Sequence, residues 1–167
     1  MYSAGVLLYC TKGDEKHFLL GSDSKYDCWS DFGGKVEYVD ENNPILTASR
    51  EFYEETGGVV FSKIHMNHLL RTSSHQLNCT SYKKRRYYMY LVECNVSEMS
   101  HITFSQFAIQ QSLISNLDTH DISKFREKKE IQTFTLDYIL SNEHMFRPVF
   151  FSSVFKNQDV IRRRVLI

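Results

Sequence analysis

The sequence has no apolar run near the roughly 20 residues that a membrane-spanning helix needs. It holds only 2 prolines and 7 glycines among 167 residues, so no long flexible linker is visible. Its 20 basic residues balance its 20 acidic residues, which excludes a global field that would attract nucleic acid or membranes. These absences predict one globular domain over residues 1–167, with no membrane partner.

The 4 cysteines are scattered without the spacing of a metal site, and we interpret them as reduced thiols. The first five residues show no charged segment followed by a long apolar core, so no secretory signal is evident. Both features predict an intracellular, cytoplasmic protein. Nothing in the pattern indicates an oligomeric state.

Three glutamates, Glu51, Glu54 and Glu55, are spaced i, i+3 and i+4. On a helix this spacing places all three carboxylates on one face, where they repel one another unless a positive charge lies against them. Divalent cations such as Mg2+ or Mn2+ take oxygen ligands and often bring substrate phosphates with them. The alternative is a solvated acidic helix face, and the carboxylates alone do not decide between the two.

The residues around the glutamates favour a built site. Asn43 and Pro44 are typical of a helix start, and Gly57 is typical of a helix end, so we expect a helix over residues 44–56. Arg50 can pair with Glu54 at i+4. Just upstream, the pair Gly33-Gly34 allows a backbone to approach a ligand closely.

The segment from Gly34 to Gly58 resembles the signature of the Nudix hydrolase superfamily, G-x5-E-x7-R-E-U-x-E-E-x-G-U, in which U is a bulky apolar residue. Its second half, from Arg50 to Gly57, matches at every fixed position. The last apolar position is Gly58, with Val59 behind it. A match of this length and density is far more specific than a lone glycine motif.

The first half of the segment departs from that pattern. Asp40 stands where the signature has Glu, and nine residues instead of seven separate it from Arg50. Two residues are therefore inserted in the loop. The first acidic ligand stays open between Glu37, Asp40 and Glu41.

The resemblance implies a fold of α+β or α/β class, an α/β/α sandwich with a mixed β-sheet. It also implies divalent-metal ligands at Glu51, Glu54, Glu55 and the Gly34 carbonyl, with catalytic roles for Glu51, Glu54 and Arg50. In this family the general base sometimes lies in a later loop. Glu130 is our candidate there, Glu127 competes with it, and a purely solvated Glu130 is an equal alternative.

Substrate contacts are expected from two segments. Trp29, Lys35 and Glu37 flank the glycine pair, although Trp29 could equally pack in the core. Four adjacent cations precede three tyrosines and could bind a polyphosphate or an RNA backbone, or form an exposed loop: Lys83, Lys84, Arg85 and Arg86.

Periodicity predicts further elements along the chain. We expect strands over residues 4–10, 17–20, 28–31, 59–70 and 87–93, with loops over 21–27 and 71–81. A helix is expected over 105–117, and short helices over 135–140 and 148–155.

Three functional hypotheses follow. The first is a Nudix pyrophosphohydrolase that cleaves a diphosphate linkage in a nucleoside diphosphate joined to another moiety. The second is removal of the RNA cap or hydrolysis of a diphosphoinositol polyphosphate, which would use the basic segment. The third is an inactive nucleotide- or RNA-binding module, which the intact glutamates and Arg50 disfavour.

Overall fold

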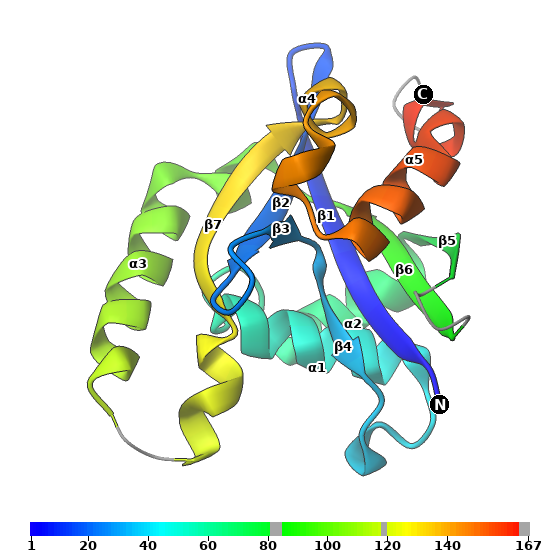
Figure 1. Cartoon of the computed structure of the whole chain (residues 1–167). Helices are drawn as coiled ribbons and strands as arrows, with labels where there is room; N and C mark the ends of the chain where they lie inside the picture. Colours follow the sequence, from blue (N-terminus) through cyan, green and yellow to red (C-terminus); the bar gives the residue numbers. More distant parts are fainter. Residues whose placement is uncertain (81–84, 118–119, 164–167) are drawn as a thin grey trace.

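The computed structural model describes residues 1–80, 85–117 and 120–163 (Figure 1). Within these ranges, seven strands form one sheet: β1 (Ser3–Lys12), β2 (Glu15–Asp23), β3 (Trp29–Ser30), β4 (Phe32–Lys35), β5 (Ser74–Thr80), β6 (Arg86–Glu93) and β7 (Lys128–Thr135). The strand order is β3-β2-β1-β6-β5, with β4 also paired to β1 and β7 to β2. Strand β1 runs parallel to β6 and antiparallel to β2 and β4, so the sheet is mixed, as predicted.

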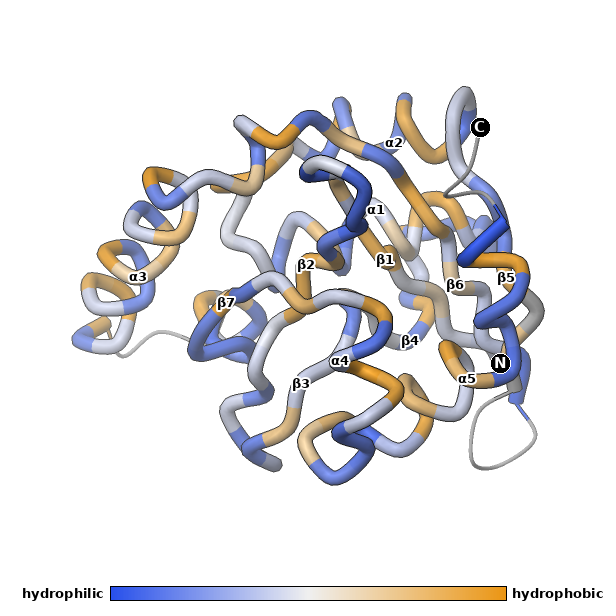
Figure 2. Tube along the Cα trace, turned by 90° about the horizontal axis from the view of Figure 1, so that it is seen from above, coloured by the Kyte–Doolittle hydropathy of each residue, from blue (hydrophilic) through white to orange (hydrophobic). Residues whose placement is uncertain are grey.

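Helices cover both faces of the sheet. Their bounds are α1 (Pro44–Thr56), α2 (Lys63–Thr72), α3 (His101–Ser115), α4 (Leu136–Ser141) and α5 (Pro148–Arg163). Side chains alternate across β1, so Val6 and Leu8 face one core while Leu7 and Tyr9 face another. The first core includes Phe52 of α1, and the second includes residues of α4 and α5. Figure 2 shows α1 and α2 on one side of the sheet and α4 and α5 on the other, which is the predicted α/β/α sandwich.

Several predicted elements are confirmed. The β1–β2 hairpin pairs Lys12 with Glu15 across its turn. Strand β6 and helices α1, α3 and α4 lie where the pattern placed them, and α5 continues past the predicted 148–155 to Arg163. None of the described helices is long and apolar enough to cross a membrane.

The predicted strand over residues 59–70 is wrong. Most of it is the helix α2, which begins after Ser62, whose side chain accepts a hydrogen bond from the backbone N–H of His65. The buried side chains of Met66 and Leu70 lie four residues apart, which is one helical turn. Ile64 points to solvent. The apolar residues at the start of this segment resemble a strand only when the cap at Ser62 is overlooked.

The two predicted loops are also partly strand. Strand β2 continues to Asp23 inside the expected loop over 21–27, and β5 occupies most of 71–81. Because β5 is the last strand in the sheet order, it lies at an edge where polar side chains can face solvent. Strand β7 was not predicted, since its first residues read as a solvated charge run.

Candidate active site

Helix α1 carries the three glutamates and begins and ends as predicted. The Asn43 side chain accepts a hydrogen bond from Ile45 N at 3.0 Å, which caps the helix start. Gly57 ends it in the left-handed conformation, with φ at 62°. Phe52 anchors the helix to the core, and the side chains of Glu51 and Glu55 are buried at its edge.

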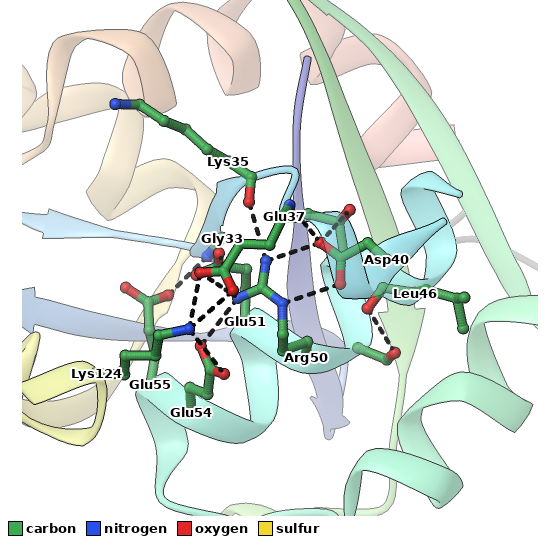
Figure 3. A network of polar contacts seen from close by, with 12 residues as sticks. Gly33, Lys35, Glu37, Asp40, Leu46, Arg50, Glu51, Glu54, Glu55 and Lys124 are labelled. Carbon is green, nitrogen blue, oxygen red and sulfur yellow. Dashed lines mark hydrogen bonds and ion pairs between the residues drawn. The ribbon is translucent and has the colours of Figure 1, made fainter. Parts of the chain in front are cut away.

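Arg50 is the centre of a buried polar network (Figure 3). Its Nη1 lies 2.9 Å from Glu51 Oε1 and 3.0 Å from Glu54 Oε2. Its Nη2 donates to the Lys35 carbonyl at 2.9 Å. Burial alone would lower the pKa of Arg50, but Asp40 and the two glutamates raise it, so the guanidinium stays charged. Arg50 therefore draws the two glutamates toward one common point.

The inserted loop supplies Asp40 to this network. Asp40 is buried, and it accepts from Arg50 Nε and Nη2, both at 2.9 Å. Thr47 also donates to it at 2.9 Å. Of the three acidic candidates in the loop, Asp40 thus anchors Arg50, and Glu37 lies beside Lys124, whose Nζ is 2.8 Å from Glu37 Oε1. Glu41 is exposed and adopts a left-handed backbone conformation, with φ at 51°.

Glu55 is held from two sides. It accepts a hydrogen bond from Gly33 N at 2.7 Å, and Lys128 Nζ lies 3.5 Å from its Oε1. Lys128 is itself fully buried and donates to Ser30 Oγ at 2.7 Å. A side chain at Gly21 would overlap the stem of Lys128, so this glycine makes room for the lysine. The network fixes the last glutamate of α1 against the glycine loop.

The residues present fit a divalent cation on two observations. Burial raises the pKa of Glu51 to about 7 against the opposing effect of Arg50, and raises the pKa of Glu55 to about 8 against Lys128. Burial outweighs the neighbouring cations at both carboxylates, and a divalent ion would favour their ionised forms. Gly34 packs so closely on Glu51 that a Cβ there would overlap the carboxylate, so the glycine lets the backbone of β4 lie directly against this side chain.

The carboxylates do not form a ready-made cation cage. Over the described ranges, no group of three or more His, Cys, Asp or Glu side chains converges closely enough to hold a metal ion. The reason is visible in Figure 3, where Arg50 and Lys124 lie between Glu37, Glu51 and Glu54. A bound cation would have to take over oxygens that Arg50 now contacts.

A cleft of about 420 Å³ opens beside Glu51. Its walls mix acidic, basic and apolar side chains: Ser3, Ser30, Asp31, Gly33, Gly34, Lys35, Glu37, Glu51, Tyr87, Glu127, Arg147, Val149 and Phe150. The buried Tyr87 hydroxyl donates to Asp31 Oδ2. Burial raises the pKa of Asp31, against the lowering effects of Tyr87, Lys128 and Arg147.

The two candidates for the general base lie in different places. Glu127 lines the cleft, and its charge contributes to the raised pKa of Glu51 and of Glu55. Glu130 is exposed on β7, pairs in register with Ser22, and is not among the residues that line the cleft.

Of the predicted substrate-contact residues, some line the cleft and others lie elsewhere. Lys35 lines the cleft, and its side chain points away from the Arg50 network in Figure 3. Trp29 packs on Phe134, with ring centroids 4.9 Å apart, and belongs to the second core. Arg85 and Arg86 are exposed and do not line the cleft. Lys83 and Lys84 lie outside the described residues.

Several residues of the site were not predicted from the sequence: Asp31, Lys124, Lys128 and Arg147. Tyr87 was singled out only as one of the three tyrosines after the basic segment. Each is brought to the site from a segment distant in the chain from Glu51, so no local spacing could reveal it. Lys128 is the clearest case, because a lysine in a charged run is ordinarily solvated.

The sequence model of the NUDIX domain family matches residues 1–138, and the chain belongs to this family. A search of curated proteins gave no significant match. Among solved structures, the chain is similar to a C. elegans Ap4A hydrolase binary complex, with 16% identity over 96% of this chain and 98% of that one, and a TM-score of 0.56.

Two further structures show the same fold. The NUDIX domain of Shewanella oneidensis NrtR, complexed with ADP ribose, is 12% identical over 98% of this chain and 87% of that one, with a TM-score of 0.56. The MutT protein from Methanosarcina mazei Go1 is 18% identical over 95% of this chain and 93% of that one, with a TM-score of 0.53. The family match ends at residue 138, so α5 lies beyond it.

Proposed function

We propose that the protein hydrolyses a diphosphate linkage in a nucleoside diphosphate joined to another moiety, with Mg2+ or Mn2+ as cofactor. The observation that carries the proposal is the cleft beside Glu51, where the family's helix glutamates meet the Gly33-Gly34 loop. The named relatives support the substrate class, since one is an Ap4A hydrolase and another binds ADP ribose.

The roles of the residues follow from their positions. Glu51, Glu54 and the Gly34 carbonyl would hold the cation, and Glu55 would join them from its place beside Gly33. When bound, the cation shields the diphosphate charge and activates a water molecule. Arg50 orients Glu51 and Glu54, and Asp40 in turn fixes Arg50.

Glu127 is the residue that we propose as general base, in place of Glu130. It lies in the same cleft as Glu51, where a proton can pass from a water to its carboxylate. Glu127→Gln should lower kcat about 100-fold at constant fold, whereas Glu130→Gln should stay near the wild-type rate. Steady-state kinetics of the two variants would measure both kcat values. A larger loss of kcat in Glu130→Gln than in Glu127→Gln would show that Glu130 is the general base instead.

A substrate panel tests the proposed activity directly. With Mg2+ or Mn2+ present, phosphate release or product chromatography would follow ADP-ribose, dinucleoside polyphosphates, nucleoside triphosphates, diphosphoinositol phosphates and capped RNA. We expect cleavage of a substrate with a nucleoside diphosphate joined to a second group, and none when EDTA removes the cation. Cleavage that persists in EDTA, or no cleavage of any substrate, would contradict the proposal.

Capped RNA and inositol substrates remain in the panel as alternatives. They rest on the basic segment, half of which lies outside the described residues, while Arg85 and Arg86 are exposed away from the cleft lining. An inactive binding module would bind a member of the panel without cleaving it.

A further inference from the structure

Arg147 is a cleft residue that the proposed mechanism does not use. It lies nine residues beyond the end of the family match, immediately before α5, and it lines the same cleft as Glu51 and Lys35. The family signature therefore says nothing about it.

The contacts of the Arg147 side chain set it apart from the other cations near α1. Arg50, Lys124 and Lys128 each lie within 4 Å of at least one carboxylate oxygen. Within the described part of the chain, the Arg147 side chain makes no hydrogen bond or ion pair, although its charge lowers the pKa of the buried Asp31. Its donors are thus available to a ligand in the cleft.

The backbone of Arg147 is fixed even though its side chain is exposed. Its N–H donates to the Trp29 carbonyl at 2.9 Å, and its carbonyl accepts from Phe151 N at 2.9 Å. The preceding residue, Phe146, is buried and forms a bridge to Trp29 of β3. The sheet and α5 together hold the Cα of Arg147 at the rim of the cleft, so little backbone entropy would be lost when its side chain binds.

Arg147 also lies where the cleft meets a second depression. That depression is lined by Tyr26, Cys28, Ser141, Glu143, His144, Phe146, Arg147 and Pro148. A ligand that extends from Glu51 into this second depression would pass the guanidinium. Guanidinium groups bind phosphate oxygens through two parallel hydrogen bonds, which an ammonium cannot reproduce.

We propose that Arg147 is a substrate-binding residue that holds a phosphate of the substrate diphosphate at the rim of the cleft. This assignment rests on the proposed function for the identity of the ligand. It makes the segment just before α5, which lies outside the family match, a part of the diphosphate site.

Binding of inorganic pyrophosphate tests the assignment without turnover. Calorimetric titration in Mg2+ would compare the full-length wild type with Arg147→Gln and with the control Lys156→Gln, which removes one exposed charge from α5. We expect the Kd for pyrophosphate to rise about tenfold or more in Arg147→Gln and to stay within twofold in the control. Equal affinity of Arg147→Gln and wild type, or no binding by wild type, overturns the assignment.

Kinetics on the substrate found in the panel provide a second readout. Arg147→Gln should raise KM about tenfold and leave kcat within threefold, because Arg147 lies apart from the Arg50 network. In Arg147→Lys the KM should lie between the values of wild type and Arg147→Gln. The thermal unfolding midpoints of all variants should match that of wild type. A fall in kcat at unchanged KM, or a lowered midpoint, would show a catalytic or structural role instead and would overturn the proposal.

The two proposals fail in different ways. If wild type hydrolyses its substrate but Arg147→Gln binds pyrophosphate as tightly as wild type does, the proposed function stands and the Arg147 assignment is wrong. If pyrophosphate affinity depends on Arg147 but no substrate is cleaved, the diphosphate site stands and the hydrolase is wrong.

Discussion

Replacing Glu54 with Gln is expected to lower Mg2+-dependent turnover about 1000-fold without unfolding the protein. Glu54 is one of the two α1 glutamates that Arg50 contacts, with Arg50 Nη1 3.0 Å from Glu54 Oε2. Gln keeps the shape and an acceptor for Arg50 but removes the charge that a divalent cation requires. Steady-state rates over a range of Mg2+ concentrations would measure the loss.

Glu15→Gln is a matched control for this substitution, because Glu15 is an exposed glutamate at the β1–β2 turn, far along the sheet from α1. Its rate should equal that of wild type. If Glu54→Gln turns over like the control, Glu54 is not a metal ligand and the assignment of α1 is wrong.

Replacing Arg50 with Gln is expected to lower the free energy of unfolding by about 3–5 kcal/mol and to abolish turnover. The Arg50 side chain is only 5% exposed, and it is the partner of the buried Asp40 as well as of Glu51 and Glu54. Without it, Asp40 would remain buried with no counter-charge. Urea unfolding followed by circular dichroism would measure the change.

A double variant separates the buried charge from general disruption. Asp40→Asn combined with Arg50→Gln should recover much of the stability, because neither partner is then a lone buried charge. Turnover should stay low in the double variant, since Glu51 and Glu54 would still lack the group that orients them. Stability of Arg50→Gln equal to wild type would contradict the network's structural role.

How far the sequence predicts the structure depends on how local the signals are. Asn43, Pro44 and Gly57 act within one helix, and α1 has the predicted bounds. The cap at Ser62 is equally local but is preceded by the apolar run 59–61, which favours a strand, and α2 was missed for that reason. Local capping chemistry outweighs apolar composition in both segments.

Long-range partners account for what the sequence could not predict in the site. Lys128 is buried because Gly21 leaves space for its aliphatic stem, Ser30 accepts its hydrogen bond and Glu55 lies against its charge. All three residues lie far from Lys128 in the chain. Asp40 could be recognised as acidic but not as the anchor of Arg50, since the inserted loop has to fold first. Arg147 lies at the cleft because its backbone is hydrogen-bonded to Trp29 of β3, which is far from it in the chain.

Direct titration with Mn2+, monitored by electron paramagnetic resonance, tests the central claim that the α1 carboxylates hold a divalent cation. We expect wild type to bind Mn2+ at millimolar or lower concentration, and Mg2+ to compete for the same site. The Glu51→Gln/Glu54→Gln double variant should lose this binding while keeping its circular dichroism spectrum. Binding that survives in the double variant, or wild type that leaves all Mn2+ free, would contradict the account.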